Sequence, residues 1–315
     1  METTIKQQII TELEKYLSLH GMSQNDFAEK SGVNAAYVSQ LRNGKTSMPA
    51  GGGKDVEISD KFYEMIANAI GLSLTKEYWQ IVPTEQMQRI LLTLEEAKEF
   101  GSTNLIIGET GSGKTYIKEL FSKQHPLDVV CVTVSSSDNI SDLIEKVSEA
   151  IKMPTAKTKS KRMRDIIRYF KTLKLDGHRP MLIFDESEYM KQPSLCAMKE
   201  FYDGLNNICS VVLIGTDQLT KNIDKLRKRN KDGIPQFYRR IKFGIRELPR
   251  IDRSFTAFFA KFNITDKILM RFLCEICDNY GELHDVLVPT MRESERIGQP
   301  ISEKLIRTIL NLPLL

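Results

Sequence analysis

Residues 108–115, Gly-Glu-Thr-Gly-Ser-Gly-Lys-Thr, fit the pattern G-x-x-x-x-G-K-[ST] at every specified position, and the apolar run 105–107 precedes them. This pattern restricts the fold, because it works as a loop between a buried strand and a helix. Glycines at 108, 111 and 113 let the loop curl around a phosphate with its N–H groups pointing inward. We expect a nucleoside triphosphate to bind here; the alternative is a chance glycine-rich turn.

Several residues of this loop have an expected role. Lys114 is expected to reach the β- and γ-phosphates, and Thr115 to offer its hydroxyl to Mg²⁺. The helix that begins near Gly113 adds the positive end of its dipole. The expected cofactors are ATP and Mg²⁺, and the expected nucleotide contacts are Gly108, Glu109, Thr110, Gly111, Ser112, Gly113, Lys114, Thr115 and Tyr116.

A second segment, 181–186, is Met-Leu-Ile-Phe-Asp-Glu, an apolar run of strand length that ends in two carboxylates. It indicates a buried parallel strand, and ligands of such sheets bind at the carboxyl ends of the strands. Asp185 is expected to hold Mg²⁺ through water, and Glu186 to orient or deprotonate the water that attacks the γ-phosphate. The alternative is a strand end with solvated acids. Together with the phosphate loop, the segment favours an ATPase over a kinase.

Composition limits the class of protein. The chain has 315 residues, 41% of them hydrophobic, which is enough for about two packed domains. No apolar stretch has membrane-spanning length and the N-terminus lacks the pattern of a secretory signal, so we expect a cytoplasmic protein with no membrane partner. The five cysteines, at 131, 196, 209, 274 and 277, are expected to be small core residues. Cys274-x-x-Cys277 lacks the second Cys/His pair of a zinc site.

Residues 24–44 have the layout of a helix-turn-helix. Gly32 permits the turn, Asn34 caps the second helix, and Asn43-Gly44 ends it. Core positions are expected at Phe27, Ala28, Val33, Val38 and Leu41, and outward positions at Asn34, Ala35, Tyr37, Gln40 and Arg42. The segment resembles the helix-turn-helix of phage repressors, which implies DNA contact by Tyr37, Gln40 and Arg42. The alternative is a module for protein contact; with one outward arginine, general DNA affinity is favoured over sequence-specific recognition.

The net charge is only +4, but many basic residues lie in two clusters. In an ATPase that also carries a DNA-binding motif, such clusters favour contact with the phosphate backbone. The alternative for each cluster is a solvated helix face. Aromatic residues are sparse within them, so stacking on single strands is not expected. The first cluster is Lys157, Lys159, Lys161, Arg162 and Arg164, and the second is Lys225, Arg227, Lys228, Arg229 and Lys231.

Hydrophobic periodicity predicts the remaining organisation. A small-residue loop is expected at 46–54, followed by helical spacing at Ile58, Phe62, Met65, Ile66 and Ile70. A helix over 84–100 and strands at 129–134, 181–185, 209–215 and 243–248 alternate with further helices, which predicts a parallel sheet. After Arg253 only helical spacing occurs, as at Ile268, Phe272 and Ile276, then Ile301, Leu305 and Ile309. We expect domains at 1–75, 76–250 and 251–315.

This order of parts resembles the phage transposition protein B family, whose members are AAA+ ATPases that select target DNA for transposition. The resemblance implies an α/β fold: an AAA+ P-loop ATPase core with a parallel sheet, preceded by an all-α helix-turn-helix domain and followed by a small helical domain. It also implies an ATP-dependent helical filament on double-stranded DNA, without base contacts, that recruits and stimulates a transposase in the cytoplasm of a bacterial host cell. Hydrolysis provoked by the transposase would release the DNA.

The resemblance also implies three further roles. Thr216, after the run 213–215, matches the sensor 1 residue that positions the attacking water. Arg240, in preference to Arg239, matches the arginine finger that enters the neighbouring subunit's site and stabilises charge on the transferring phosphoryl group; the alternative is that both arginines pair with surface acids. His284 occupies the position of the sensor 2 arginine, so either it acts when protonated, or Arg292 compensates, or the contact is absent.

Two other functions remain open from the sequence. One is a helicase-loader ATPase that serves DNA replication. The other is a DNA-binding regulator whose oligomeric state is switched by nucleotide.

Overall fold

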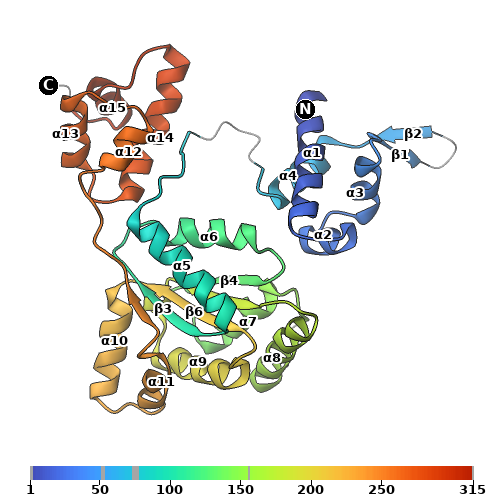
Figure 1. Cartoon of the computed structure of the whole chain (residues 1–315), viewed down its shortest axis with the longest axis vertical. Coiled ribbons are helices and arrows are strands. Elements are labelled where there is room, and N and C mark those ends of the chain that lie inside the picture. Colours follow the sequence, from blue (N-terminus) through green and yellow to red (C-terminus); the bar gives the residue numbers. More distant parts are fainter. Residues whose placement is uncertain (1–2, 51–53, 73–77, 155–156, 314–315) are drawn as a thin grey trace. The chain divides into compact units, whose positions relative to one another are not determined.

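The computed structural model describes residues 3–50, 54–72, 78–154 and 157–313. The chain divides into two compact units, Met1–Glu77 and Tyr78–Leu315. Figure 1 shows the helices and strands of both units. The first unit contains helices α1 (Thr3–Leu19), α2 (Gln24–Ser31), α3 (Ala35–Arg42) and α4 (Asp60–Ala69), with a hairpin of β1 (Ser47–Ala50) and β2 (Lys54–Glu57).

The predicted helix-turn-helix is present as α2 and α3. A capping box of Ser23 and Asp26 starts α2, and Gly32, with a φ of 73°, ends it in the left-handed region that glycine adopts without strain. The Asn34 side chain accepts a hydrogen bond from the amide of Ala36 at 2.9 Å and starts α3. Of the five predicted core residues, Phe27, Val33, Val38 and Leu41 are buried, and Ala28 is half-buried.

Two expectations for this unit are wrong. The segment expected to be a loop forms antiparallel pairs from Ser47–Glu57 to Ala50–Lys54; its residues 51–53 lie outside the described part of the chain. Tyr37 and Gln40 do not remain outward. The Tyr37 ring stacks on Phe62 of α4 at a centroid distance of 3.9 Å, and Gln40 is half-buried. Of the three predicted DNA contacts in this unit, Arg42 is the exposed one.

The second unit is built on a five-stranded sheet in the order β4-β5-β6-β3-β7, in which every pairing is parallel. The predicted strands are confirmed to within two residues. Because all five strands run the same way, the loops after them meet at one edge of the sheet. The strands are β3 (Thr103–Ile107), β4 (Val129–Thr133), β5 (Met181–Asp185), β6 (Ser210–Gly215) and β7 (Ile245–Glu247).

Helices cover both faces of this sheet (Figure 1). Side chains alternate along each strand: Leu105 and Ile107 enter one hydrophobic core, and Ile106 between them enters the other. The core of Ile106 is closed by α5 (Glu85–Phe100) and α6 (Lys114–Gln124). The opposite core is closed by α7 (Ile140–Ala150), α8 (Lys159–Leu175), α9 (Gln192–Leu205), α10 (Asp217–Lys228) and α11 (Ile234–Ile241), and a short 3-10 helix, η1 (Ser187–Tyr189), follows β5.

The chain after β7 is helical, as predicted, but its apolar stripe was misplaced in part. Asp266 caps α13 (Lys267–Ile276) by accepting the amide hydrogen of Ile268 at 2.9 Å, and Ile268 is 70% exposed in the first turn. Phe272 is buried as predicted, and Leu269 and Leu273 complete the buried stripe. The helices are α12 (Thr256–Lys261), α13 (Lys267–Ile276), α14 (Tyr280–Ile297) and α15 (Glu303–Ile309). None of the described helices is both long and apolar enough to cross a membrane.

The cysteines differ in environment. Cys209 and Cys277 are buried, and burial raises the pKa of Cys277 to about 12. Cys274 is exposed, so the expectation of a core residue is wrong there. No group of three or more possible metal ligands of the His, Cys, Asp or Glu type was found among the described residues.

Gly244 should tolerate no side chain. Its carbonyl accepts the amide hydrogen of Leu105, and a Cβ there would lie 2.3 Å from the backbone oxygen of Thr103. We expect Gly244→Ala to lower the free energy of unfolding by about 2–3 kcal/mol through this clash. Gly177→Ala is the control, since its Cβ would meet open space and only its φ of 89° carries a cost, about 1 kcal/mol. Urea denaturation measures the free energy of unfolding of both variants. Equal losses would contradict the close approach of Gly244 to the backbone of Thr103.

Candidate active site

A cavity of about 480 Å³ lies at the edge of the sheet where the strands end. It collects residues from the loop after β3, the end of β5, the end of β6 and the start of α14. Eleven of the residues predicted from the sequence line it: Thr110, Gly111, Ser112, Gly113, Lys114, Thr115, Tyr116, Asp185, Glu186, Thr216 and His284. One cavity therefore gathers most of the predicted nucleotide contacts.

The lysine of the phosphate loop is held by the loop itself. Lys114 Nζ donates to the carbonyl oxygens of Gly108 at 2.9 Å and Glu109 at 2.7 Å. Burial lowers the pKa of Lys114, and the nearby carboxylates, Glu188 foremost, oppose that shift. The ammonium group is thus held against the carbonyl oxygens of its own loop, and Lys114 is also among the residues that line the cavity.

The start of α14 packs against the phosphate loop. Gly281 donates its amide hydrogen to the carbonyl of Gly111 at 3.3 Å, and Asn279 caps the helix. Gly111 has a φ of 73°, and a Cβ there would lie 2.1 Å from the side-chain oxygen of Asn279. Glycine at 111 is required both by the turn and by this contact.

Asp185 is buried and receives three hydrogen bonds. Its Oδ2 accepts from Thr115 Oγ1 and from Lys118 Nζ, each at 2.9 Å, and its Oδ1 accepts from the amide of Glu186 at 3.0 Å. The hydroxyl of Thr115 and the carboxylate of Asp185 are oxygen donors of the kind that Mg²⁺ prefers. The pair therefore fits the predicted metal position, but the buried lysine beside it was not foreseen.

Glu186 stands at a bend. Its φ of 56° is unusual for a residue other than glycine and turns its backbone away from the line of β5. Burial first, and then the neighbouring carboxylates Glu188 and Asp185, raise the pKa of Glu186 above its ordinary value of 4.5. A carboxyl group with a raised pKa beside a ligand cavity is suited to accept a proton.

Three cavity residues carry buried polar atoms with no hydrogen-bond partner among the described residues. They are the hydroxyl of Ser112, the hydroxyl of Thr216 and Oε2 of Glu188. A buried polar atom without a partner is costly, so such atoms at one site favour a polar ligand or bound water. Of the three, the sequence pointed to Ser112 and Thr216.

Part of the cavity lining is apolar. This part consists of Trp79, Val82 and Met87, which precede or begin the core, and of Phe258 and Tyr280 of the C-terminal helices. The Trp79 ring lies 5.4 Å from that of Phe258 and meets the ring of His284 edge-on at 5.0 Å. His284 Nδ1 lies 2.9 Å from Asp285 Oδ1. Arg292, the predicted substitute, does not line the cavity.

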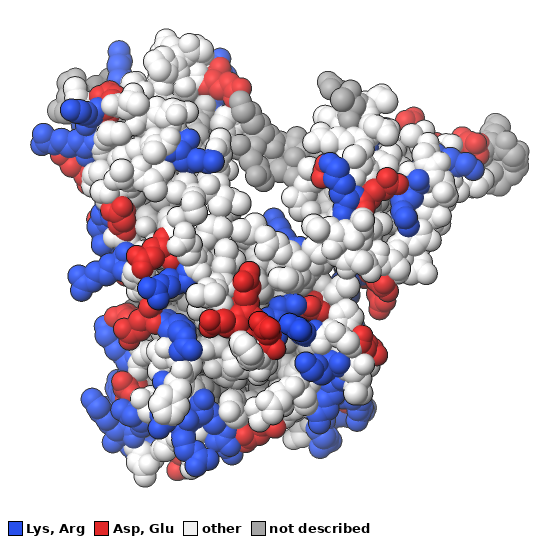
Figure 2. Space-filling view, in the orientation of Figure 1, with Lys and Arg blue, Asp and Glu red and all other residues white. Residues whose placement is uncertain are grey.

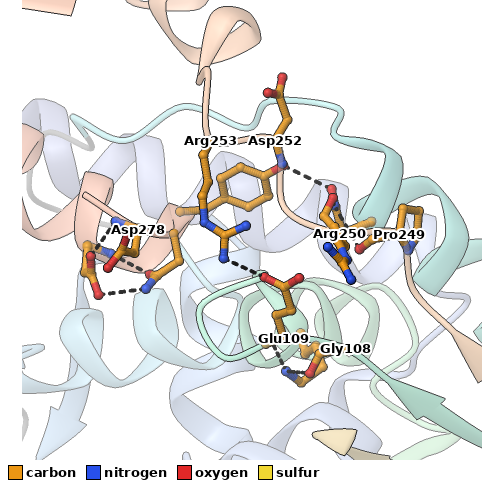
Figure 3. Close-up of polar contacts among 12 residues, drawn as sticks. Gly108, Glu109, Pro249, Arg250, Asp252, Arg253 and Asp278 are labelled. Atoms are coloured by element: carbon orange, nitrogen blue, oxygen red, sulfur yellow. Dashed lines mark hydrogen bonds and ion pairs between the residues drawn. The ribbon is translucent and has the colours of Figure 1, made fainter. Parts of the chain in front are cut away.

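Polar contacts tie the start of the C-terminal helices to the core (Figure 3). Arg253 donates to Glu109 of the phosphate loop at 2.9 Å. The Gln86 side chain donates to the carbonyl of Arg250 at 2.7 Å, and the Tyr280 hydroxyl donates to Gln86 at 3.1 Å while it accepts from the amide of Asp252 at 3.2 Å. The phosphate loop and α5 are thereby each joined to the segment that begins the C-terminal part of the chain.

Arg240 lies on α11 and does not line the cavity. Its guanidinium pairs with Asp203 of α9 at 2.7 Å and donates to the carbonyl of Gln236 at 3.0 Å, which leaves the side chain 18% exposed. Arg239, beside it, is exposed. A role for Arg240 in a neighbouring subunit would require this ion pair to open.

The two basic clusters lie on different helices. Lys157, Lys159, Lys161, Arg162 and Arg164 surround the start of α8, and Lys225, Arg227, Lys228, Arg229 and Lys231 surround the end of α10. Lysine and arginine side chains gather over both regions in Figure 2. Within the clusters, Arg162 pairs with Glu145 at 3.3 Å and Arg227 with Asp224 at 3.2 Å. Partial pairing leaves each cluster largely open to solvent.

Comparison with known proteins agrees with this architecture. Residues 101–223 match the AAA domain family, and residues 13–50 match the helix-turn-helix family. The fold is similar to that of Cdc6p from Pyrobaculum aerophilum, with a TM-score of 0.53 and 14% identity over 74% of this chain and 68% of that one. It is also similar to the ADP form of the ORC2 protein of Aeropyrum pernix, with a TM-score of 0.51 and 16% identity over 77% and 71%.

The fold and the site define an ATPase of the AAA class preceded by a helix-turn-helix domain, a module that suggests DNA binding. The AAA domain implies that the chain binds nucleotide. The protein is, more particularly, a distant homologue of the Mu-like prophage FluMu DNA transposition protein B of Haemophilus influenzae, with 24% identity over 212 residues, 67% of this chain and 70% of that one.

Tyr280→Phe tests the network between the core and the C-terminal helices. Loss of the buried hydroxyl leaves the Gln86 oxygen and the Asp252 amide without this partner. We expect the free energy of unfolding to fall by about 1–2 kcal/mol. Tyr78→Phe is the matched control, because its hydroxyl bonds Glu295 at an exposed position, where the expected loss is below about 0.5 kcal/mol. Denaturant titration measures the free energy of unfolding of both variants. Equal losses in Tyr280→Phe and Tyr78→Phe would contradict a stabilising role for the hydrogen bonds of Tyr280.

Proposed function

We propose that this protein is an ATP-dependent DNA-binding ATPase that forms filaments on target DNA and recruits and activates a transposase. The observation that supports it most is one cavity that gathers Lys114, Asp185 and Glu186 in a chain that also carries a helix-turn-helix. The relative named for DNA transposition covers two thirds of the chain. ATP would be the nucleotide, and double-stranded DNA, a transposase and further copies of the chain the partners.

The cavity suggests how hydrolysis would proceed. The phosphates would lie on the loop, where Lys114 and the unpartnered Ser112 hydroxyl stabilise their charge. Mg²⁺, held by Thr115 and, through water, by Asp185, would neutralise part of that charge. Glu186 would orient the attacking water and accept its proton, and the Thr216 hydroxyl would help to hold that water in line.

DNA contact would come mainly from the basic clusters at 157–164 and 225–231. Lysine and arginine on exposed helix ends neutralise backbone phosphates without reading bases. Arg42 would add contact from the helix-turn-helix. Coupling to assembly would come from an arginine of α11, either Arg240 after release from Asp203 or the exposed Arg239, completing a neighbour's site. Nucleotide state would then set the stability of the filament.

ATP-dependent coating of DNA is the first test. The parent should sediment with long random-sequence duplex in the presence of ATP and Mg²⁺, with a steep salt dependence, and far less with ADP. Lys114→Ala should abolish coating, because it removes the ammonium that binds the phosphates. Lys123→Ala, on an exposed position of α6, should behave as the parent. Equal sedimentation with ATP, with ADP and without nucleotide would contradict the filament. Binding to a hexameric helicase in place of a transposase would favour a helicase loader. Nucleotide-dependent assembly without coating of DNA would favour a regulator.

Glu186→Gln should separate binding from hydrolysis. The amide cannot accept the proton of the attacking water, so we expect ATP turnover to fall by about 10²–10⁴-fold while ATP-dependent coating persists longer. Glu119→Gln, an exposed change on α6, is the control for loss of one carboxylate. Phosphate release and filament lifetime are the measurements, and turnover at the parent's rate would show that Glu186 is not the base.

A further inference from the structure

Lys118 is a buried lysine next to the proposed metal position. It follows Lys114 by four residues and so lies on the same face of α6, one turn further along. Lys118 is 5% exposed, and its ammonium lies 2.9 Å from Oδ2 of Asp185, which is 2% exposed. A lysine is rarely buried unless it is paired, because its charge loses the stabilisation of water. Asp185 supplies that pairing.

The lysine shares its acceptor with a proposed metal ligand. Oδ2 of Asp185 accepts from Lys118 Nζ and from Thr115 Oγ1 at equal distances of 2.9 Å, while Oδ1 is held by the amide of Glu186. The carboxylate is thus fixed on three sides. The ammonium of Lys118 thus bonds the same carboxylate oxygen as the hydroxyl of Thr115, the other proposed metal ligand.

Charge at the site depends on this side chain. Three carboxylates, those of Asp185, Glu186 and Glu188, lie near the two ammonium groups of Lys114 and Lys118. Lys114 is expected to be occupied by the phosphates when nucleotide binds. Lys118 cannot follow it into the cavity, because it does not line the cavity and its ammonium is already paired.

We propose that Lys118 is a positioning residue that holds Asp185 in place and stands in for part of the metal's charge, so that Mg²⁺ is retained only together with nucleotide phosphates. This inference rests on the proposed ATPase function and names the device that regulates the metal at that site. The positive charge of Lys118, fixed beside Asp185, repels Mg²⁺ as a second cation at the same carboxylate. The site without nucleotide therefore has little attraction for Mg²⁺, and nucleotide can enter before the metal.

The test compares the parent, Lys118→Met and Lys123→Met. Methionine keeps the unbranched apolar stem and removes the charge, and Lys123 is an exposed lysine of the same helix. Trp79 is the single tryptophan of the chain and lines the cavity, so its fluorescence reports nucleotide entry. Fluorescence titrations with ATP and with ADP, in EDTA and over a range of Mg²⁺ concentrations, are combined with thermal unfolding in the absence of nucleotide.

For the parent and Lys123→Met, we expect nucleotide to change Trp79 fluorescence even in EDTA, and Mg²⁺ alone to leave Tm unchanged. For Lys118→Met, we expect Mg²⁺ alone to raise Tm, because the metal replaces the lost partner of Asp185. We also expect the Mg²⁺ concentration at half-saturation with ATP to fall by about tenfold. A merely structural role for Lys118 would lower Tm without moving this Mg²⁺ midpoint.

An unchanged Mg²⁺ midpoint in Lys118→Met would overturn the inference. If that variant does not fold, the parent protein alone tests the inference. A rise in the parent's Tm with Mg²⁺ alone would overturn the inference, and so would nucleotide binding that occurs only in the presence of Mg²⁺. Failure of the proposed function looks different, since ATP would then change neither the Trp79 fluorescence nor the Tm of the parent at any Mg²⁺ concentration.

Discussion

Parallel pairing in the five-stranded sheet is the constraint on which the site depends. Because β3 pairs with β6 and β6 with β5, the loops that follow these three strands leave the sheet at one edge. The phosphate loop, Asp185 and Thr216 meet there although more than 100 residues separate the first from the last. The three central strands β3, β5 and β6 are buried on both faces, so the edge where they end is held by two hydrophobic cores rather than by the polar residues it presents.

The strands and the phosphate loop could be predicted because local pattern determines them. An apolar run such as 181–184 has few alternatives to a buried strand, and a glycine-rich loop before Lys114 has a fixed geometry. The apolar part of the cavity lining could not be predicted, since Trp79, Phe258 and Tyr280 meet through tertiary packing of segments about 180–200 residues apart. Lys118 had a visible signal in its spacing from Lys114, but only the structure shows its partner.

The helix-turn-helix illustrates a different limit. Its cap residues and four of its five core residues were predicted correctly, since each follows from helix geometry. Whether a residue outside the core is outward depends on what else packs against the helix. Here α4 supplies Phe62, which takes up the Tyr37 ring, so the surface left on α3 is smaller than its helical pattern implies.

The contact of α14 with the phosphate loop bears on how this ATPase can be divided. Gly281 and Asn279 touch Gly111, and Trp79 from the opposite end of the unit packs on Phe258. A fragment cut at residue 250 would retain every signature residue of the loop and of β5. It would nevertheless lose Phe258 and Tyr280 and leave Trp79 uncovered, so the C-terminal helices form one wall of the cavity and cannot be removed without opening it.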